Sequence, residues 1–373
     1  MRPQASLAAL TLAVALAGTG SARADSGPVP LRRIALGELG GWIELTATLD
    51  GRAGRWLLDT GASRNLVSPT LARQLGLEPA GTMRAETPLG AVQGGEVTLP
   101  PLVVGRFERR EERALVIEPA RLLGPAGEGI DGVLGAPWLA GQRAELNLRD
   151  WTAQFGGDDS APCPEALAPV ALTRHRSLPV ITLATGERYV LDSGNPAGLI
   201  RIEAEPPEPA TQGLILAGEL RLTVLPEAVL GPQRRSDVPV LRLTQPALHR
   251  ALGDAARGLA GTAFLDGARW ALDLAHERLC VEGGPFATPG GFGLVPERAG
   301  IGLRVQQVLP GSPADRAGIR AGEVIAQWAG LPASRPLAEL WLALQGREEL
   351  VLGIGEPVRA LTLKRAIFAP AAP

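Results

Sequence analysis

The feature that most constrains the fold is a local pattern that occurs twice. Residues 42–49 alternate apolar and polar side chains as a half-buried β-strand does, Asp50-Gly51 marks a turn, and a return strand runs into Asp59-Thr60-Gly61-Ala62-Ser63. Residues 179–183 and 188–191 repeat the hairpin, and the second strand again runs into Asp192-Ser193-Gly194-Asn195. Each half of this region therefore holds a hairpin that ends in Asp-(Thr/Ser)-Gly.

A second matched pair follows in the same order. Residues 132–148 align without gaps with residues 258–274, and both segments begin with a Gly-containing apolar run. Two matches in one order indicate an internal duplication, and two copies are too few for a solenoid. We expect two similar lobes over 30–156 and 165–283, joined by a Pro-, Gly- and Asp-rich linker over 156–164. In the first lobe, Ser68, Pro69 and Gly76 predict a helix over 69–75.

The duplicated Asp-(Thr/Ser)-Gly predicts a pair of carboxyl groups. If the lobes face each other across a pseudo-twofold axis, Asp59 and Asp192 meet, and two adjacent carboxylates share one proton. The ionised member then activates a water while the protonated member hydrogen-bonds a carbonyl. The hydroxyls of Thr60 and Ser193 are expected to hydrogen-bond across to the opposite loop. The alternative interpretation is two ordinary turns with solvated Asp side chains.

These motifs resemble the lobes of aspartic proteases of the retropepsin/pepsin clan, over about residues 30–283. The resemblance rests on Leu57-Leu58-Asp59-Thr60-Gly61-Ala62-Ser63 with Val133-Leu134-Gly135, and on Val190-Leu191-Asp192-Ser193-Gly194 with Leu259-Ala260-Gly261. It implies a mainly β fold of two lobes around a cleft, with Asp59 and Asp192 as the catalytic residues. It also implies a flap hairpin over 89–95, containing Gly90, Ala91 and Val92.

The resemblance has two departures. The flap segment lacks a Tyr, because the only Tyr of the chain is Tyr189. Asn195 stands where the family has a small or hydroxylated residue. Its side-chain amide is expected either to donate to an Asp192 oxygen or to mark a specialised or weakened site.

The last quarter of the chain has a different pattern. It contains Gly291-Phe292-Gly293-Leu294, then Gly311-Ser312-Pro313-Ala314, Ala317-Gly318 and Gly322-Glu323-Val324-Ile325. This resembles a PDZ domain of the bacterial protease-associated type over 287–370, which implies a small α+β domain that binds C-termini. Backbone amides of Gly291, Phe292, Gly293 and Leu294 are expected to hold a terminal carboxylate, and the next strand offers an edge for a peptide. Alternatively, the domain only packs against the lobes.

The N-terminal segment predicts the compartment. Arg2, a short apolar run over 7–16 and Ala22-Arg23-Ala24 form the pattern of a secretory signal peptide over 1–24, cut after Ala24, although an uncleaved anchor is the alternative. We therefore expect a periplasmic or secreted protein without a membrane span in its mature chain. In an oxidising compartment Cys163 and Cys280 either form a disulfide or remain two buried thiols.

Other functional classes find no support in the sequence. The formal net charge of −2 lacks the positive footprint of a nucleic-acid-binding protein. Three scattered His residues and two distant Cys form no metal pattern, so we expect no metal and no cofactor. The sequence thus predicts an aspartic endopeptidase whose partners are protein or peptide substrates and C-terminal peptide ligands. The competing hypotheses are a catalytically silent peptide-binding protein on the same scaffold and a PDZ-centred adaptor.

Overall fold

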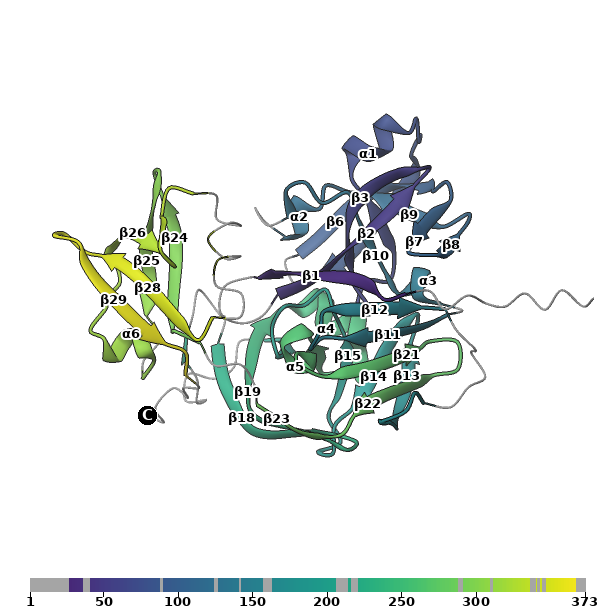
Figure 1. Cartoon of the computed structure of the whole chain (residues 1–373). Coiled ribbons are helices and arrows are strands. Elements are labelled where there is room, and N and C mark those ends of the chain that lie inside the picture. The colour runs from purple at the N-terminus through teal and green to yellow at the C-terminus, as the bar shows by residue number, and fades with distance from the viewer. Residues whose placement is uncertain are drawn as a thin grey trace, which may run out of the picture.

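Figure 1 shows a computed structural model of the whole chain, in which β-strands dominate. The structure describes residues 27–35, 41–87, 90–123, 127–140, 142–156, 163–205, 214–215, 221–287, 291–308, 311–335, 340, 343 and 347–366. The predicted signal peptide over 1–24 lies outside the described residues. Among the described residues, no helix combines the length and the apolar character needed to cross a membrane.

The first half of the β-rich region is a hairpin followed by shorter strands and helices. Its elements are β1 (Val29–Ala35), β2 (Gly41–Leu49), β3 (Arg52–Leu58), β4 (Asn65–Val67), α1 (Pro69–Gln74), β5 (Ala80–Thr87), β6 (Gly90–Thr98), β7 (Leu102–Val104), β8 (Phe107–Arg109), β9 (Arg113–Val116), α2 (Ala120–Leu123), β10 (Gly132–Leu134), α3 (Ala136–Leu139), β11 (Arg143–Asn147) and β12 (Thr152–Phe155).

The second half repeats the order of hairpin, apolar strand and short helix. Its elements are β13 (Leu167–His175), β14 (Leu178–Thr182), β15 (Arg188–Leu191), β16 (Leu199–Glu203), β17 (Leu214–Ile215), β18 (Arg221–Leu230), β19 (Gln233–Thr244), α4 (Pro246–Leu252), the 3-10 turn η2 (Gly253–Ala255), β20 (Gly258–Ala260), α5 (Thr262–Leu265), β21 (Arg269–Asp273), β22 (Arg278–Glu282) and β23 (Gly284–Ala287).

The strand pairing shows that the two halves are related by an internal twofold. In the first half β10 pairs in parallel with β3 and antiparallel with β4, and in the second half β20 pairs in the same way with β15 and β16. The halves share a six-strand layer in the order β1–β12–β11–β21–β22–β13. At its centre Glu145 pairs with Ala271, which are equivalent positions of the repeat. The pseudo-twofold axis therefore passes between β11 and β21.

The structure contains the strand and the helix that the sequence predicts in the first half. The predicted strand over 42–49 is part of β2, and Ile43, Leu45 and the other apolar positions are buried. The predicted helix is α1, in which the Ser68 hydroxyl accepts the Leu71 N–H at 3.1 Å. Glu44 departs from the strict alternation because it is buried. It forms ion pairs with Arg55 and Arg32, which compensate for its removal from water.

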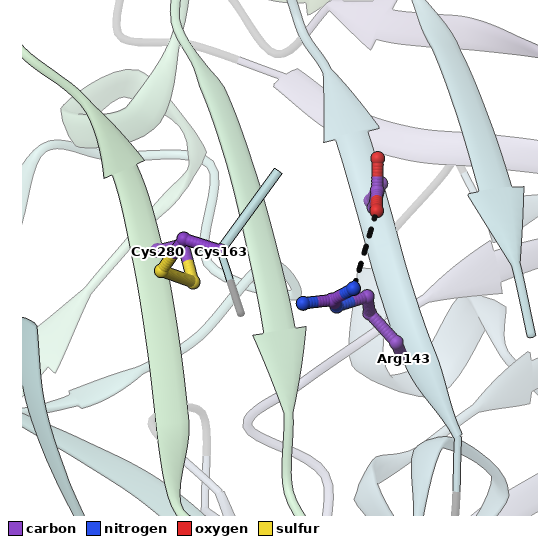
Figure 2. The surroundings of a disulfide bond; sticks show 4 residues. Arg143, Cys163 and Cys280 are labelled. Carbon is purple, nitrogen blue, oxygen red and sulfur yellow. Dashed lines mark ion pairs between the residues drawn. A yellow bond between two sulfur atoms is a disulfide. The ribbon is translucent and has the colours of Figure 1, made fainter. Parts of the chain in front are cut away.

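Cys163 and Cys280 form a disulfide, which decides between the two alternatives left open by the sequence. Their Cα atoms lie 5.7 Å apart, and 117 residues separate them along the chain. Figure 2 shows the bond at β22, together with Arg143, whose guanidinium lies 4.0 Å from the Glu145 carboxylate on β11. The disulfide ties the segment that enters the second half to the shared six-strand layer.

The C-terminal part forms a separate six-stranded sheet with its own apolar core (Figure 1). Its elements are β24 (Leu294–Ala299), β25 (Gly302–Val308), α6 (Pro313–Arg316), β26 (Val324–Trp328), β27 (Leu331–Pro332), β28 (Glu349–Ile354) and β29 (Arg359–Lys364). The strand path runs β24-β25-β26-β28-β29, so β24 lies at one end of it. Leu340 is fully buried in this core.

Candidate active site

Asp59 and Asp192 each begin the loop that follows a buried strand. The Asp59 N–H donates to the Leu134 carbonyl of β10 at 2.9 Å, and the Asp192 N–H donates to the Ala260 carbonyl of β20 at 2.8 Å. The strands β3 and β15 are pinned by their parallel partners, so both Asp residues leave their sheets at equivalent points. The duplicated sequence thus produces duplicated geometry.

Reciprocal hydrogen bonds join the two loops. The Thr60 hydroxyl donates to the Leu191 carbonyl at 2.6 Å and accepts the Ser193 N–H at 3.0 Å. The Ser193 hydroxyl donates to the Leu58 carbonyl at 2.7 Å and accepts the Thr60 N–H at 3.0 Å. All four groups are buried, and the four bonds fix the separation of the loops.

Each loop glycine lies against the opposite carboxyl group. A methyl group on Gly61 would collide with the Asp192 carboxyl, and one on Gly194 would collide with the Asp59 carboxyl. The Gly61 N–H donates to Asp59 at 2.9 Å and the Gly194 N–H donates to Asp192 at 3.0 Å. Glycine is therefore required at both positions by close approach.

The environment favours the protonated form of the pair. Burial raises the pKa of Asp59, although hydrogen bonds with Asp192 and with nearby backbone amides act in the opposite direction. The pKa of Asp192 is raised well above its usual value, first by burial and then by the charge of Asp59 and a hydrogen bond with it. Because two adjacent carboxylates in a poorly hydrated site cannot both ionise, the pair is expected to hold one proton at moderately acidic pH.

The first of the two Asp loops lies in a segment that is similar to a known protein family. A family model described as aspartyl protease matches residues 45–138. Residues 45–138 form an aspartyl protease domain. This domain contains Asp59, and the match ends before Asp192.

A crystal structure of a retropepsin-like aspartic protease from Rickettsia conorii is similar to part of the chain, with 18% sequence identity and a TM-score of 0.26. The similarity covers 35% of this chain and 89% of that chain. No curated protein matches the chain.

The flap segment of the aspartyl protease domain forms a hairpin, but its centre is displaced from the predicted one. Gly90, Ala91 and Val92 begin the second strand, β6, which pairs with β5; residues 88 and 89 between the strands lie outside the described residues. Val92 is 9% exposed and belongs to an apolar cluster with Trp42 and Leu57. The prediction placed the flap hairpin over 89–95, whereas residues 90–95 all lie within the single strand β6.

Of the two alternatives for Asn195, the structure does not contain the hydrogen bond from its side-chain amide to Asp192. The Asn195 Oδ1 accepts the Ala197 N–H at 3.0 Å, which closes a local turn, and the buried Nδ2 has no partner among the described residues. The Asn195 backbone N–H donates to the Asp192 backbone carbonyl at 3.0 Å, which closes the turn after the aspartate. Ala62 is the equivalent residue of the first loop, and its N–H likewise donates to the Asp59 carbonyl at 3.2 Å.

The structure already uses one of the four backbone amides of the expected carboxylate cradle over residues 291–294. The Gly291 N–H donates to the Ala366 carbonyl at 2.8 Å, so this amide is already used. Phe292 and Leu294 are buried in the core of the C-terminal sheet, with exposures of 0% and 3%. Gly293 has a φ of 79°, which explains the glycine, since a left-handed backbone disfavours other residues.

Sequence reasoning missed two residues at the Asp192 loop, Trp42 and Thr262. The Trp42 indole donates to the Gly194 carbonyl at 2.7 Å, and the Thr262 hydroxyl lies 2.9 Å from the Asn195 carbonyl. The repeat alignment held a signal for Thr262, because its counterpart is Ala136. Among the described residues, no three His, Cys, Asp or Glu side chains form a group that would hold a metal ion.

Proposed function

We propose that the chain is an aspartic endopeptidase in which Asp59 and Asp192 act as one catalytic pair. The supporting observation is that four reciprocal hydrogen bonds join two equivalent Asp loops, and that the glycine of each loop lies directly against the carboxyl group of the other. Asp192 is 8% exposed and Asp59 is only partly buried, so the pair keeps some contact with solvent. Two solvated turn residues would not need this cross-linking.

In this mechanism the ionised carboxylate removes a proton from a water, and the water oxygen attacks the peptide carbonyl carbon. The protonated carboxyl donates its proton to the carbonyl oxygen, giving a neutral tetrahedral diol. One carboxyl then gives its proton to the leaving nitrogen as the C–N bond breaks, while the other carboxylate takes the proton of a diol hydroxyl, which leaves the product carboxylic acid. No covalent bond to the enzyme is formed, and the pair regains its single proton.

Asp59→Asn and Asp192→Asn test this proposal. Each variant should lose turnover of an unfolded protein substrate by at least about a thousandfold, because half of the pair can no longer exchange protons. Asp50→Asn is the matched control: Asp50 is an exposed turn residue with a φ of 48°, which Asn tolerates, and activity should be unchanged. Retained turnover in either folded dyad variant would contradict the proposal. A folded wild-type protein that binds peptides without cleaving them would instead support the silent peptide-binding protein.

The pH profile offers a second test of the same pair. Activity requires one protonated and one ionised carboxyl, so the profile should be bell-shaped with its maximum below neutrality. The raised pKa of Asp192 moves the upper limb toward neutral pH. A profile that rises continuously through pH 8 would argue for a different catalytic base.

We further propose that residues 287–370 form a PDZ domain that binds the C-termini of substrates or partners. Support comes from the glycine- and proline-containing run after β25, from the independent core of the sheet, and from the terminal position of β24 in its strand order. Ser312 caps α6 by accepting the Asp315 N–H, which accounts for the Gly-Ser-Pro-Ala segment. Terminal-carboxylate recognition then depends on amides other than that of Gly291.

Binding to the full-length Asp59→Asn variant tests this second proposal without cleavage of the probe. Peptides ending in an apolar residue should bind at least tenfold more tightly as free acids than with an amidated C-terminus. Equal binding would exclude carboxylate recognition and favour a domain that only packs against the lobes.

We also propose a periplasmic or secreted location. The disulfide supports it, because such bonds persist in oxidising compartments, and the N-terminal pattern agrees. N-terminal sequencing of the protein from its native host should find a chain that starts at Asp25.

A further inference from the structure

The two Asp loops have matching backbone partners, yet the Asp192 loop has additional contacts from the first half of the chain. Trp42, at the start of β2, is 5% exposed. Its Nε1–H donates to the Gly194 carbonyl at 2.7 Å, across 152 residues of sequence. A buried indole N–H usually has a hydrogen-bond partner, and here that partner is the catalytic loop of the opposite repeat.

Thr262 adds a second contact at the same place. Its hydroxyl lies 2.6 Å from the Gly41 carbonyl and 2.9 Å from the Asn195 carbonyl, so its proton serves one or the other. Thr262 is 3% exposed, which makes water a poor substitute. Thr262 thus lies between the start of β2 and the Asn195 carbonyl, next to the Gly194–Asn195 peptide that Trp42 contacts.

The other repeat does not contain this arrangement. Glu44 pairs with Leu57, two residues before Asp59, and Val180 pairs with Val190, two residues before Asp192. The counterpart of Trp42 is therefore Leu178. The counterpart of Thr262 is Ala136, and neither Leu178 nor Ala136 has a side-chain donor. The contact belongs to one of two otherwise equivalent loops.

The peptide unit that Trp42 contacts also holds the aspartate. The carbonyl of the Gly194–Asn195 peptide accepts from Trp42, and its N–H, which is that of Asn195, donates to the backbone carbonyl of Asp192 at 3.0 Å. A donor on a peptide carbonyl polarises the N–H of the same unit and strengthens the bond that it makes. Trp42 therefore acts on Asp192 through one rigid peptide.

We propose that Trp42 and Thr262 form a one-sided brace that positions Asp192 in the catalytic pair. The brace makes the two carboxyl groups inequivalent, so that the loop of Asp192 is held while that of Asp59 relies on the shared hydrogen bonds. Trp42 and Thr262 are positioning residues, and their role in turnover rests on the proposed peptidase function.

Trp42→Phe removes the N–H and keeps an aromatic ring. We expect kcat to fall about tenfold with KM within twofold, since the loss of one buried hydrogen bond shifts the aspartate rather than the peptide-binding surface. Thr262→Val should have a similar effect, and Thr262→Ser, which keeps the hydroxyl, should restore kcat to within twofold of wild type. Trp270→Phe is the matched control, because the buried Trp270 indole has no hydrogen-bond partner among the described residues. Its kcat should be unchanged.

Amide hydrogen exchange gives a readout that does not depend on activity. In Trp42→Phe, protection should fall at least tenfold in a peptide covering 190–197 and stay unchanged in one covering 57–64. Equal loss in both loops, unchanged protection, or an unaltered kcat in Trp42→Phe would overturn the brace. If the wild type cleaves no peptide, the peptidase function fails, and the exchange asymmetry alone still decides whether the brace exists.

Discussion

Asp59 and Asp192 occupy equivalent positions in the two repeats but differ in environment. Asp192 is the more buried, and its pKa is raised by burial and by the neighbouring charge of Asp59. Burial also raises the pKa of Asp59, and the hydrogen bonds that it accepts oppose that rise. The difference assigns the higher pKa of the pair to Asp192, while the two carboxyl groups share their proton as a unit.

A stability measurement tests this assignment. Because the folded pKa of Asp192 lies above its unfolded value, its contribution is fully present below the unfolded pKa and is lost as pH rises through the folded pKa. Between the unfolded pKa, at about pH 4, and the folded pKa, each added pH unit lowers the unfolding free energy of the wild type by up to about 1.4 kcal/mol. Asp192→Asn has no ionisable group at this position and therefore lacks this cost. Urea unfolding at pH 4, 5.5 and 7 should show that the unfolding free energy of the variant depends less on pH than that of the wild type, and that the variant is the more stable protein at pH 7. Parallel curves for variant and wild type would contradict the assignment.

The hairpin β2–β3 carries the first Asp loop, and a buried charge helps to hold it. The Glu44 carboxylate lies 2.6 Å from Nη2 of Arg55 on β3 and 3.1 Å from Nη1 of Arg32 on β1. The Glu44 side chain is 3% exposed, whereas both Arg side chains keep contact with water. One carboxylate thus joins three neighbouring strands at low desolvation cost for its partners.

Removal of this carboxylate should weaken the hairpin. We expect Glu44→Ala to lower the unfolding free energy by about 2 kcal/mol, because charge-assisted hydrogen bonds to two strands are lost. Glu227→Ala is the control, since Glu227 on β18 pairs with Arg234 on β19 while both side chains are more than half exposed. Its cost should stay below about 1 kcal/mol. Equal costs in urea unfolding would show that burial of Glu44 adds nothing.

The whole molecule consists of two related halves with a common core and a C-terminal sheet with a separate one. The largest apolar cluster includes residues of both halves, from Leu31 to Val281, so the shared layer around β11 and β21 is part of the interior. The loops bearing the two aspartates are therefore held together by the core beneath them as well as by their own hydrogen bonds.

The Cys163–Cys280 disulfide stabilises this arrangement by closing a long loop. A crosslink across 117 residues restricts the unfolded chain, and its loss is expected to cost about 3 to 5 kcal/mol. Urea unfolding with and without reductant should show this difference for the wild type. The Cys163→Ala/Cys280→Ala variant should be as weak as the reduced wild type and insensitive to reductant. A variant as stable as the oxidised protein would contradict the argument.

The duplicated hairpins, the Ser68-capped helix and the equivalence of Asp59 and Asp192 could be predicted from the sequence. These features depend on residues close together in the chain, where alternation, turn residues and capping act locally, and the repeat indicated that the two loops are paired. The roles of Trp42, Glu44, Asn195 and Gly291 could not be predicted in this way. Trp42 contacts a residue 152 positions away, and Gly291 gives its amide to Ala366, contacts for which no local pattern exists. Burial and hydrogen-bond partners of this kind arise when separate segments pack, so they were set by the fold as a whole.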